Sequence, residues 1–120
     1  MDERVRFITH KGKKILFIDL TGRSADEIRA LLPDIQAAIT SEPRGSVLSL
    51  SHWTGAQLSR DVAEEIKKTM VFDRPHIRRT ALVGIEQLPK VFLDALKNFS
   101  RREYTVFPSL DEAKDWLVED

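Results

Sequence analysis

The sequence contains no cysteine, so the chain cannot form a disulfide, a thiolate nucleophile or a cysteine-ligated metal site. It also lacks an excess of either charge, because Lys plus Arg and Asp plus Glu each total 19 and the formal net charge is zero. Nothing in this balance attracts the chain to nucleic acid or to an anionic membrane. No run reaches the ~20 apolar residues of a membrane span, and MDERVRFITH lacks the apolar core of a signal peptide. We therefore expect a bacterial, cytoplasmic protein without stable membrane insertion.

Catalytic motifs are missing as well. The five glycines are too scattered for a Walker loop or a dinucleotide-binding fingerprint, and there is no GxSxG elbow. His10, His52 and His76 lie in three separate segments without the spacing of metal ligands. Ser49 and Ser51 are close to His52, but alternation along a strand points neighbours to opposite faces, so we interpret this stretch as a polar strand end. We predict no enzymatic activity, no cofactor and no metal site.

The residues that are present suit one folded globular domain. Hydrophobic residues make up 42% of the chain and charged residues 32%, which is far from the composition of a disordered chain. A length of 120 residues falls in the usual range of a single domain and allows one substantial core. We therefore predict one domain over residues 1–120.

Apolar runs predict a β-hairpin at the start of this domain. The runs 5–9 and 14–20 flank the turn signal Lys11-Gly12. Residues 15–18, with the sequence ILFI, are apolar on both alternating faces, which a strand tolerates only when helices cover both sides of its sheet. Further strands are expected over residues 46–51, 79–85 and 104–107.

Helical spacing separates these later strands. Ser24 and Glu27 form a capping box before the first helix, and Pro33 inside that helix predicts a kink or a break near Leu32. Further helices are expected over residues 59–73, 89–99 and 109–117, with Trp116 buried against the sheet. Strands that alternate with helices imply an α/β fold, with a mixed, mainly parallel five-stranded sheet and about four helices.

This order of elements carries a resemblance to a known family. Together with ALVGIEQLPKVFLDALKNF followed by YTVFPSLDEAKDWL, it resembles the SpoIIAA-like branch of the STAS domains, the fold of bacterial anti-sigma-factor antagonists and of the cytosolic domains of sulfate transporters. The branch is also compared with CRAL-TRIO lipid-binding domains. The resemblance implies a regulatory or binding role rather than catalysis.

One turn departs from the family pattern. Antagonists that resemble this fold carry Asp-Ser-Ser/Thr-Gly after the third strand, where a partner kinase phosphorylates the first hydroxyl residue. The corresponding stretch here is His52-Trp53-Thr54-Gly55, so Trp53 stands where the phosphorylated serine would be. We therefore do not expect the phosphorylation switch at this turn, and Thr54 is at most a weak substitute.

The candidate site is placed by the topology of the sheet. Ligands of open α/β sheets bind where parallel strands end, and several polar loops are expected to meet there. Trp53 is either an exposed hot spot for binding or a ring that folds back over the second helix onto the core. Asp19 is either a carboxyl with a raised pKa or, more in keeping with its position, a cap of nearby turn amides. The candidate ligand- or partner-binding residues are Asp19, Thr21, Arg23, His52, Trp53, Thr54, Gly55 and Glu86.

Two functional hypotheses follow. The first is a non-catalytic regulatory module whose loops dock a protein partner or small ligand, with a homodimer through the exposed hairpin edge. The second is a carrier of a lipid or other small apolar ligand, which an apolar cavity of ~300 Å³ or more would favour and a filled core would not. Basic residues near strand starts and helix ends suit the helix dipoles, and no aromatic residues interleave with them, so nucleic-acid binding is not expected.

Overall fold

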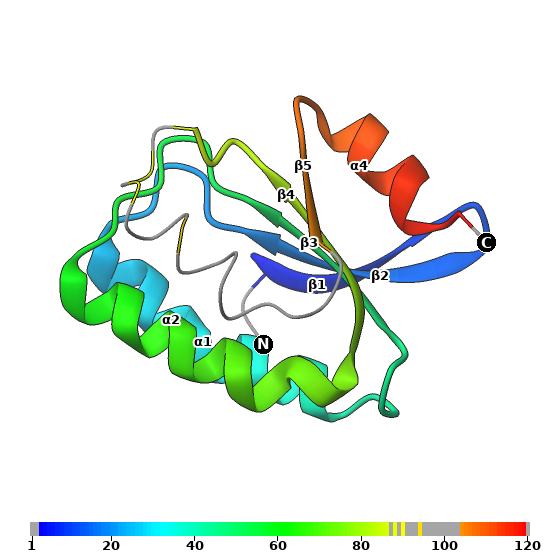
Figure 1. The fold of residues 1–120 in the computed structure, drawn as a ribbon, viewed down its shortest axis with the longest axis horizontal. Coiled ribbons are helices and arrows are strands. Elements are labelled where there is room, and N and C mark those ends of the chain that lie inside the picture. The colour runs from blue at the N-terminus through cyan, green and yellow to red at the C-terminus, as the bar shows by residue number, and fades with distance from the viewer. Residues whose placement is uncertain (1–2, 87, 89, 91–93, 95–103, 120) are drawn as a thin grey trace.

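The computed structural model describes residues 3–86, 88, 90, 94 and 104–119 of the chain. Five strands form one sheet in the order β1-β2-β3-β4-β5, with β1 antiparallel to β2 and the other neighbours parallel (Figure 1). The strands are β1 Val5–His10, β2 Lys13–Asp19, β3 Val47–His52, β4 Ile77–Val83 and β5 Tyr104–Phe107. The predicted mixed sheet with a hairpin at one edge is confirmed.

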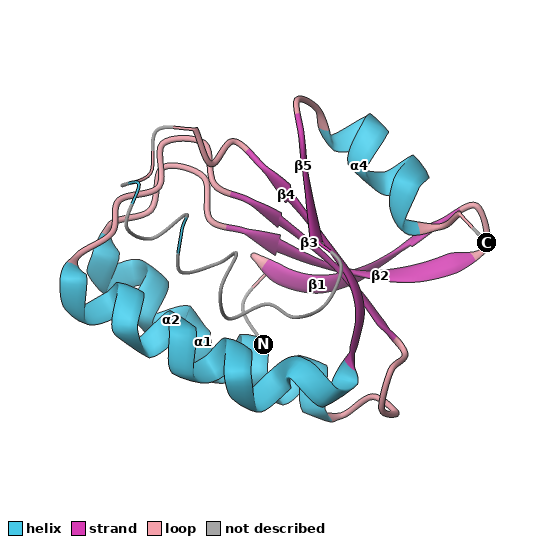
Figure 2. Cartoon of the chain, in the orientation of Figure 1, coloured by secondary structure: helices cyan, strands magenta, loops and turns pink. Residues whose placement is uncertain are grey.

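Helices cover both faces of this sheet. α1 Ala25–Thr40 and α2 Arg60–Asp73 lie along one face, α4 Leu110–Leu117 lies on the other, and a 3-10 turn η1 Arg74–His76 joins α2 to β4 (Figure 2). The expected helix over residues 89–99 lies mostly outside the described residues, so three α-helices are described where about four were expected. None of the described helices is long and apolar enough to span a membrane.

The alternation along β2 explains the two cores. Leu16 and Ile18 join the core beneath α1 and α2, whereas Ile15 and Phe17 join the core beneath α4. Successive side chains of a strand point to opposite faces, so an uninterrupted apolar run serves both layers. The prediction that helices cover both sides of the sheet is therefore confirmed.

α1 shows one difference from the expectation. The helix runs unbroken across Pro33, so the predicted break near Leu32 is wrong. Pro33 is exposed, while Ile28, Leu31 and Ile35 on the opposite side are buried. Burial of these apolar side chains against the sheet offsets the backbone hydrogen bond that a proline removes.

Candidate functional site

The edge where β2 and β3 end holds Asp19 and His52, which are register partners across the two strands. Asp19 Oδ1 accepts hydrogen bonds from Thr21 N at 3.1 Å and Thr21 Oγ1 at 2.6 Å, and Arg4 Nη1 lies 3.5 Å away. Partial burial raises the pKa of Asp19, but the Thr21 hydrogen bonds and the charges of Arg4 and His52 outweigh it and lower the pKa. Asp19 therefore caps groups of the following turn, and this interpretation of the sequence is confirmed. The alternative prediction, a carboxyl group with a raised pKa, is wrong.

Backbone contacts lock the loops after β2 and β3 together. Leu20 N donates to His52 O and Gly22 N donates to Thr54 O, both at 2.9 Å, and His52 Nε2 lies 3.0 Å from Thr54 Oγ1. Gly84, which follows β4, has a φ of +77°, and a Cβ there would lie 2.8 Å from Thr54 N. The candidate residues Thr21, His52, Thr54 and Gly55 are thus brought together on a fitted edge whose polar groups largely bond to one another.

Two other candidates have side chains outside this edge cluster. The backbone of Arg23 still joins the two loops, since Arg23 N donates to Leu20 O and Gln57 N donates to Arg23 O. Its side chain turns away, and Nη1 pairs with Glu27 Oε2 of α1 at 2.6 Å. Glu86 is exposed, and within the described residues no hydrogen bond or ion pair joins it to the other candidates. The same part of the chain holds no group of three His, Asp or Glu side chains that could bind a metal ion.

Trp53 belongs to the core and not to an exposed loop. Its residue surface is only 5% exposed, its ring packs in the core beneath α1 and α2, and Nε1 donates to Ser51 Oγ at 2.7 Å. Satisfying the indole N–H internally removes the main cost of burying the ring. The expectation of an exposed hot spot is wrong, and the alternative, a ring folded onto the core, is confirmed.

Trp116 is more accessible than Trp53. It is half-buried. Its ring centroid lies 5.4 Å from that of Phe107, and the Arg79 guanidinium lies 5.2 Å from the centre of the Trp116 ring. The predicted packing of Trp116 on the α4 side of the sheet is confirmed, but full burial is wrong. The ring, carried by α4, lies at the margin of that core between Phe107 and the Arg79 guanidinium.

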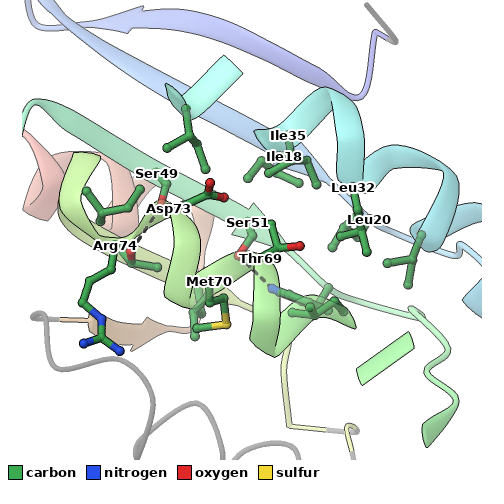
Figure 3. Close-up of a pocket in the computed structure, with 17 residues that line it drawn as sticks. Ile18, Leu20, Leu32, Ile35, Ser49, Ser51, Thr69, Met70, Asp73 and Arg74 are labelled. Atoms are coloured by element: carbon green, nitrogen blue, oxygen red, sulfur yellow. Dashed lines mark hydrogen bonds between the residues drawn. The ribbon is translucent and has the colours of Figure 1, made fainter. Parts of the chain in front are cut away.

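A pocket of about 140 Å³ lies between the sheet and the pair α1 and α2 (Figure 3). Its wall is mostly aliphatic and includes Ile18, Leu20, Leu32, Ile35, Ile66 and Met70. Trp53 also lines it, so this candidate residue contributes to a buried site rather than to the edge loops.

Small polar residues at the middle of the sheet leave this space open. Ser49 and Ser51 on β3 and Thr80 on β4 face α1 and α2, and Ser49 Oγ donates to Thr80 Oγ1 at 3.1 Å. On the opposite face the same strand presents Leu48 and Leu50 to the apolar core beneath α4. The alternation in VLSLS therefore places two serines on a buried face, a signal of the pocket that the strand-end interpretation missed.

Asp73, the last residue of α2, brings a carboxyl group into the same pocket. It is 3% exposed, and its Oδ1 has no hydrogen-bond partner among the described residues. Burial raises the pKa of Asp73 to about 7, although the charge of His76 opposes this rise. Sequence reasoning missed Asp73, yet its spacing of seven from Ile66 places it on the buried stripe of α2.

Comparison with solved structures supports the architecture. An uncharacterised protein of the DUF3478 family from Shewanella loihica PV-4, which has a SpoIIAA-like fold, superposes with a TM-score of 0.76 at 18% identity. The match covers 94% of this chain and 91% of that chain. No protein-family model and no curated protein matches the sequence. The chain therefore has a SpoIIAA-like α/β fold, as the sequence resemblance implied.

Proposed function

We propose that this protein is a non-catalytic binding module that holds a small, mostly hydrocarbon ligand in the pocket beneath α1 and α2. The observation that carries the proposal is an aliphatic pocket of about 140 Å³ inside the larger core. A cavity of roughly 150 Å³ with aliphatic walls is large enough to bind a molecule such as benzene. The volume is below the ~300 Å³ typical of pockets for larger ligands, so the proposal concerns a small ligand and not a long-chain lipid.

The edge loops give weaker support for docking a protein partner. Their aromatic residue, Trp53, is buried, and the polar groups of Asp19, Thr21, His52 and Thr54 bond mainly within the edge. Interface hot spots need an anchor that a partner can reach. We therefore favour the ligand-binding alternative over the docking module.

Titration with ethylbenzene, followed by amide NMR, tests the proposal. We expect shifts at residues of the pocket, such as Ile35 and Ile66, and none at residues facing α4. Ser49→Leu should abolish these shifts because the larger side chain fills the floor of the pocket.

Thr9→Leu on β1 is the matched control, because Thr9 is exposed and far from the pocket lining. It should bind ethylbenzene as the wild-type protein does. The proposal fails if the wild-type protein shows no shifts up to the solubility of ethylbenzene, or if Ser49→Leu shows the same shifts.

A further inference from the structure

We infer that the ligand is a small neutral alcohol or phenol whose hydroxyl group binds Asp73 while its hydrocarbon part fills the space beneath α1 and α2. This inference rests on the proposed function and names the chemistry of the ligand. It starts from an acceptor that the fold buries without a partner: Asp73 Oδ1, in a residue that is 3% exposed, has no hydrogen bond among the described residues.

Asp73 is placed to receive a ligand. The residue ends α2, and Figure 3 shows its carboxyl group pointing from the helix into the pocket, on the side of the sheet where Ser49 lies. A buried acceptor without a partner keeps the full penalty of losing water, so a donor brought by a ligand removes that penalty. Among the described residues no side chain donates to Asp73 Oδ1: Ile35 carries only carbon, and Ser49 Oγ donates to Thr80 Oγ1 instead.

The hydroxyl groups on the pocket floor indicate that the ligand also accepts a hydrogen bond. Ser51 Oγ accepts the indole N–H of Trp53, and Thr80 Oγ1 accepts from Ser49, so the Ser51 and Thr80 hydroxyl hydrogens have no acceptor among the described residues. The ligand therefore meets both an acceptor without a donor and donors without an acceptor. An alcohol both donates and accepts through one oxygen, whereas an ammonium group only donates.

Charge also favours a neutral ligand. An ammonium paired with the Asp73 carboxylate would place two ions in an aliphatic pocket, and the loss of their hydration can exceed their attraction. A carboxylate ligand would bring a like charge against Asp73. The protein itself places positively charged groups at this end of the pocket. Arg74 lines it and His76 lies near Asp73, so Asp73 does not depend on a ligand for a positive charge nearby.

Three probes of equal size test the inference: ethylbenzene, benzyl alcohol and benzylammonium, each with eight non-hydrogen atoms. Calorimetry or NMR would measure their affinities for the wild-type protein, Asp73→Leu and Asp73→Asn. We expect Asp73→Leu to weaken benzyl alcohol about tenfold more than ethylbenzene, which is the effect of one lost hydrogen bond. Asp73→Asn retains a carbonyl oxygen and should keep most of the preference for benzyl alcohol.

The outcomes separate the inference from the proposed function. If Asp73→Leu weakens benzyl alcohol and ethylbenzene equally, the hydroxyl inference is overturned while ethylbenzene binding still supports the binding module. If benzylammonium loses more affinity than benzyl alcohol in Asp73→Leu, the ligand class is cationic and the inference is wrong. If none of the probes binds the wild-type protein, the proposed function itself fails.

A measurement on the wild-type protein covers the case in which Asp73→Leu does not fold. The carboxyl ¹³C signal of Asp73 should move when benzyl alcohol binds and move much less with ethylbenzene, because only the alcohol reaches the carboxyl group with a donor. Equal movement with both probes would overturn the inference.

Discussion

Asp73 shows how one residue can combine a local and a tertiary role. Locally it ends α2 and precedes the 3-10 turn that leads into β4. In the fold it places a carboxyl group among aliphatic side chains of the pocket, where burial raises its pKa to about 7. A carboxyl group retained in such a place destabilises the ionised protein unless a donor reaches it.

Asp73 should make the protein less stable as the pH rises. Its pKa is 3.8 in the unfolded chain and about 7 in the folded protein, so between these values only the folded state keeps the proton. The free energy of unfolding then falls with increasing pH, by about 1.4 kcal/mol per unit at most. Asp73→Asn removes this contribution. Urea denaturation of both proteins from pH 3.5 to 8.5 should show the difference between them changing up to about pH 7 and constant above it.

Other carboxyl groups titrate in both proteins, so only the difference curve reports on Asp73. Asp34→Asn on α1, which lies outside the pocket lining, serves as a control substitution of the same chemistry. A difference curve that does not change with pH would show that Asp73 titrates as an ordinary carboxyl.

Trp53→Ala should destabilise the protein by ~3 to 5 kcal/mol, because it truncates a large ring in the core beneath α1 and α2 and leaves Ser51 without its indole donor. Urea denaturation measures this loss. Two single-tryptophan variants compare exposure directly. Trp116→Phe leaves only Trp53, and Trp53→Phe leaves only Trp116. Acrylamide should quench the fluorescence of Trp53 less than that of Trp116. Equal quenching would contradict the burial of Trp53.

At the scale of elements, the ends of β2, β3 and β4 are fitted to one another rather than left as free loops. Leu20 N donates to His52 O at the end of β3, and Gly22 N donates to Thr54 O in the loop that follows. Trp53 N donates to Val83 O at 2.8 Å. Contacts of this kind hold the backbone that carries the Trp53 ring into the pocket lining.

Gly84→Ala tests the fit of this edge. A Cβ at Gly84 would overlap Thr54 Oγ1 and lie 2.8 Å from Thr54 N, in addition to the strain of a φ of +77°. Gly12→Ala is the matched control, because Gly12 has a φ of +81° but nothing within 4 Å of its Cβ position. The control should lose ~1 to 2 kcal/mol from backbone strain alone, and Gly84→Ala should lose more. Equal losses in thermal denaturation would mean that Thr54 moves aside without cost.

For the whole molecule, one sheet separates two cores of different character. The core facing α4 is filled by aliphatic side chains such as Leu48, Leu50 and Ala81, whereas the core facing α1 and α2 contains the serines and the pocket. The proposed ligand would therefore complete the side of the molecule that its own side chains leave open.

Several basic side chains among the described residues are engaged within the molecule. Lys14 pairs with Glu42 at 2.6 Å, Lys11 pairs with Asp115 at 3.1 Å, and Arg79 donates to carbonyl oxygens at the end of α4. Charges already paired, in a chain of zero net charge, give little attraction to phosphates. Fluorescence anisotropy with single-stranded DNA at physiological ionic strength should show no submicromolar binding, and salt-sensitive binding in that range would contradict this prediction.

The sequence by itself determined the elements and their order. The spacing of apolar residues, the Lys11-Gly12 turn and the capping box of Ser24 and Glu27 act between neighbours along the chain, so they can be recognised without the fold. The uninterrupted ILFI run even indicated that both faces of the sheet are covered.

Only the tertiary structure decided where the candidate site lies. Burial of Trp53 depends on a bond to Ser51 and on packing beneath two helices, and the pocket depends on how far α1 and α2 stand from Ser49, Ser51 and Thr80. A tryptophan in a polar loop and two serines in a strand are equally compatible with solvent. Distances between segments far apart in the chain set their environment, and those distances follow from the packing of the whole core.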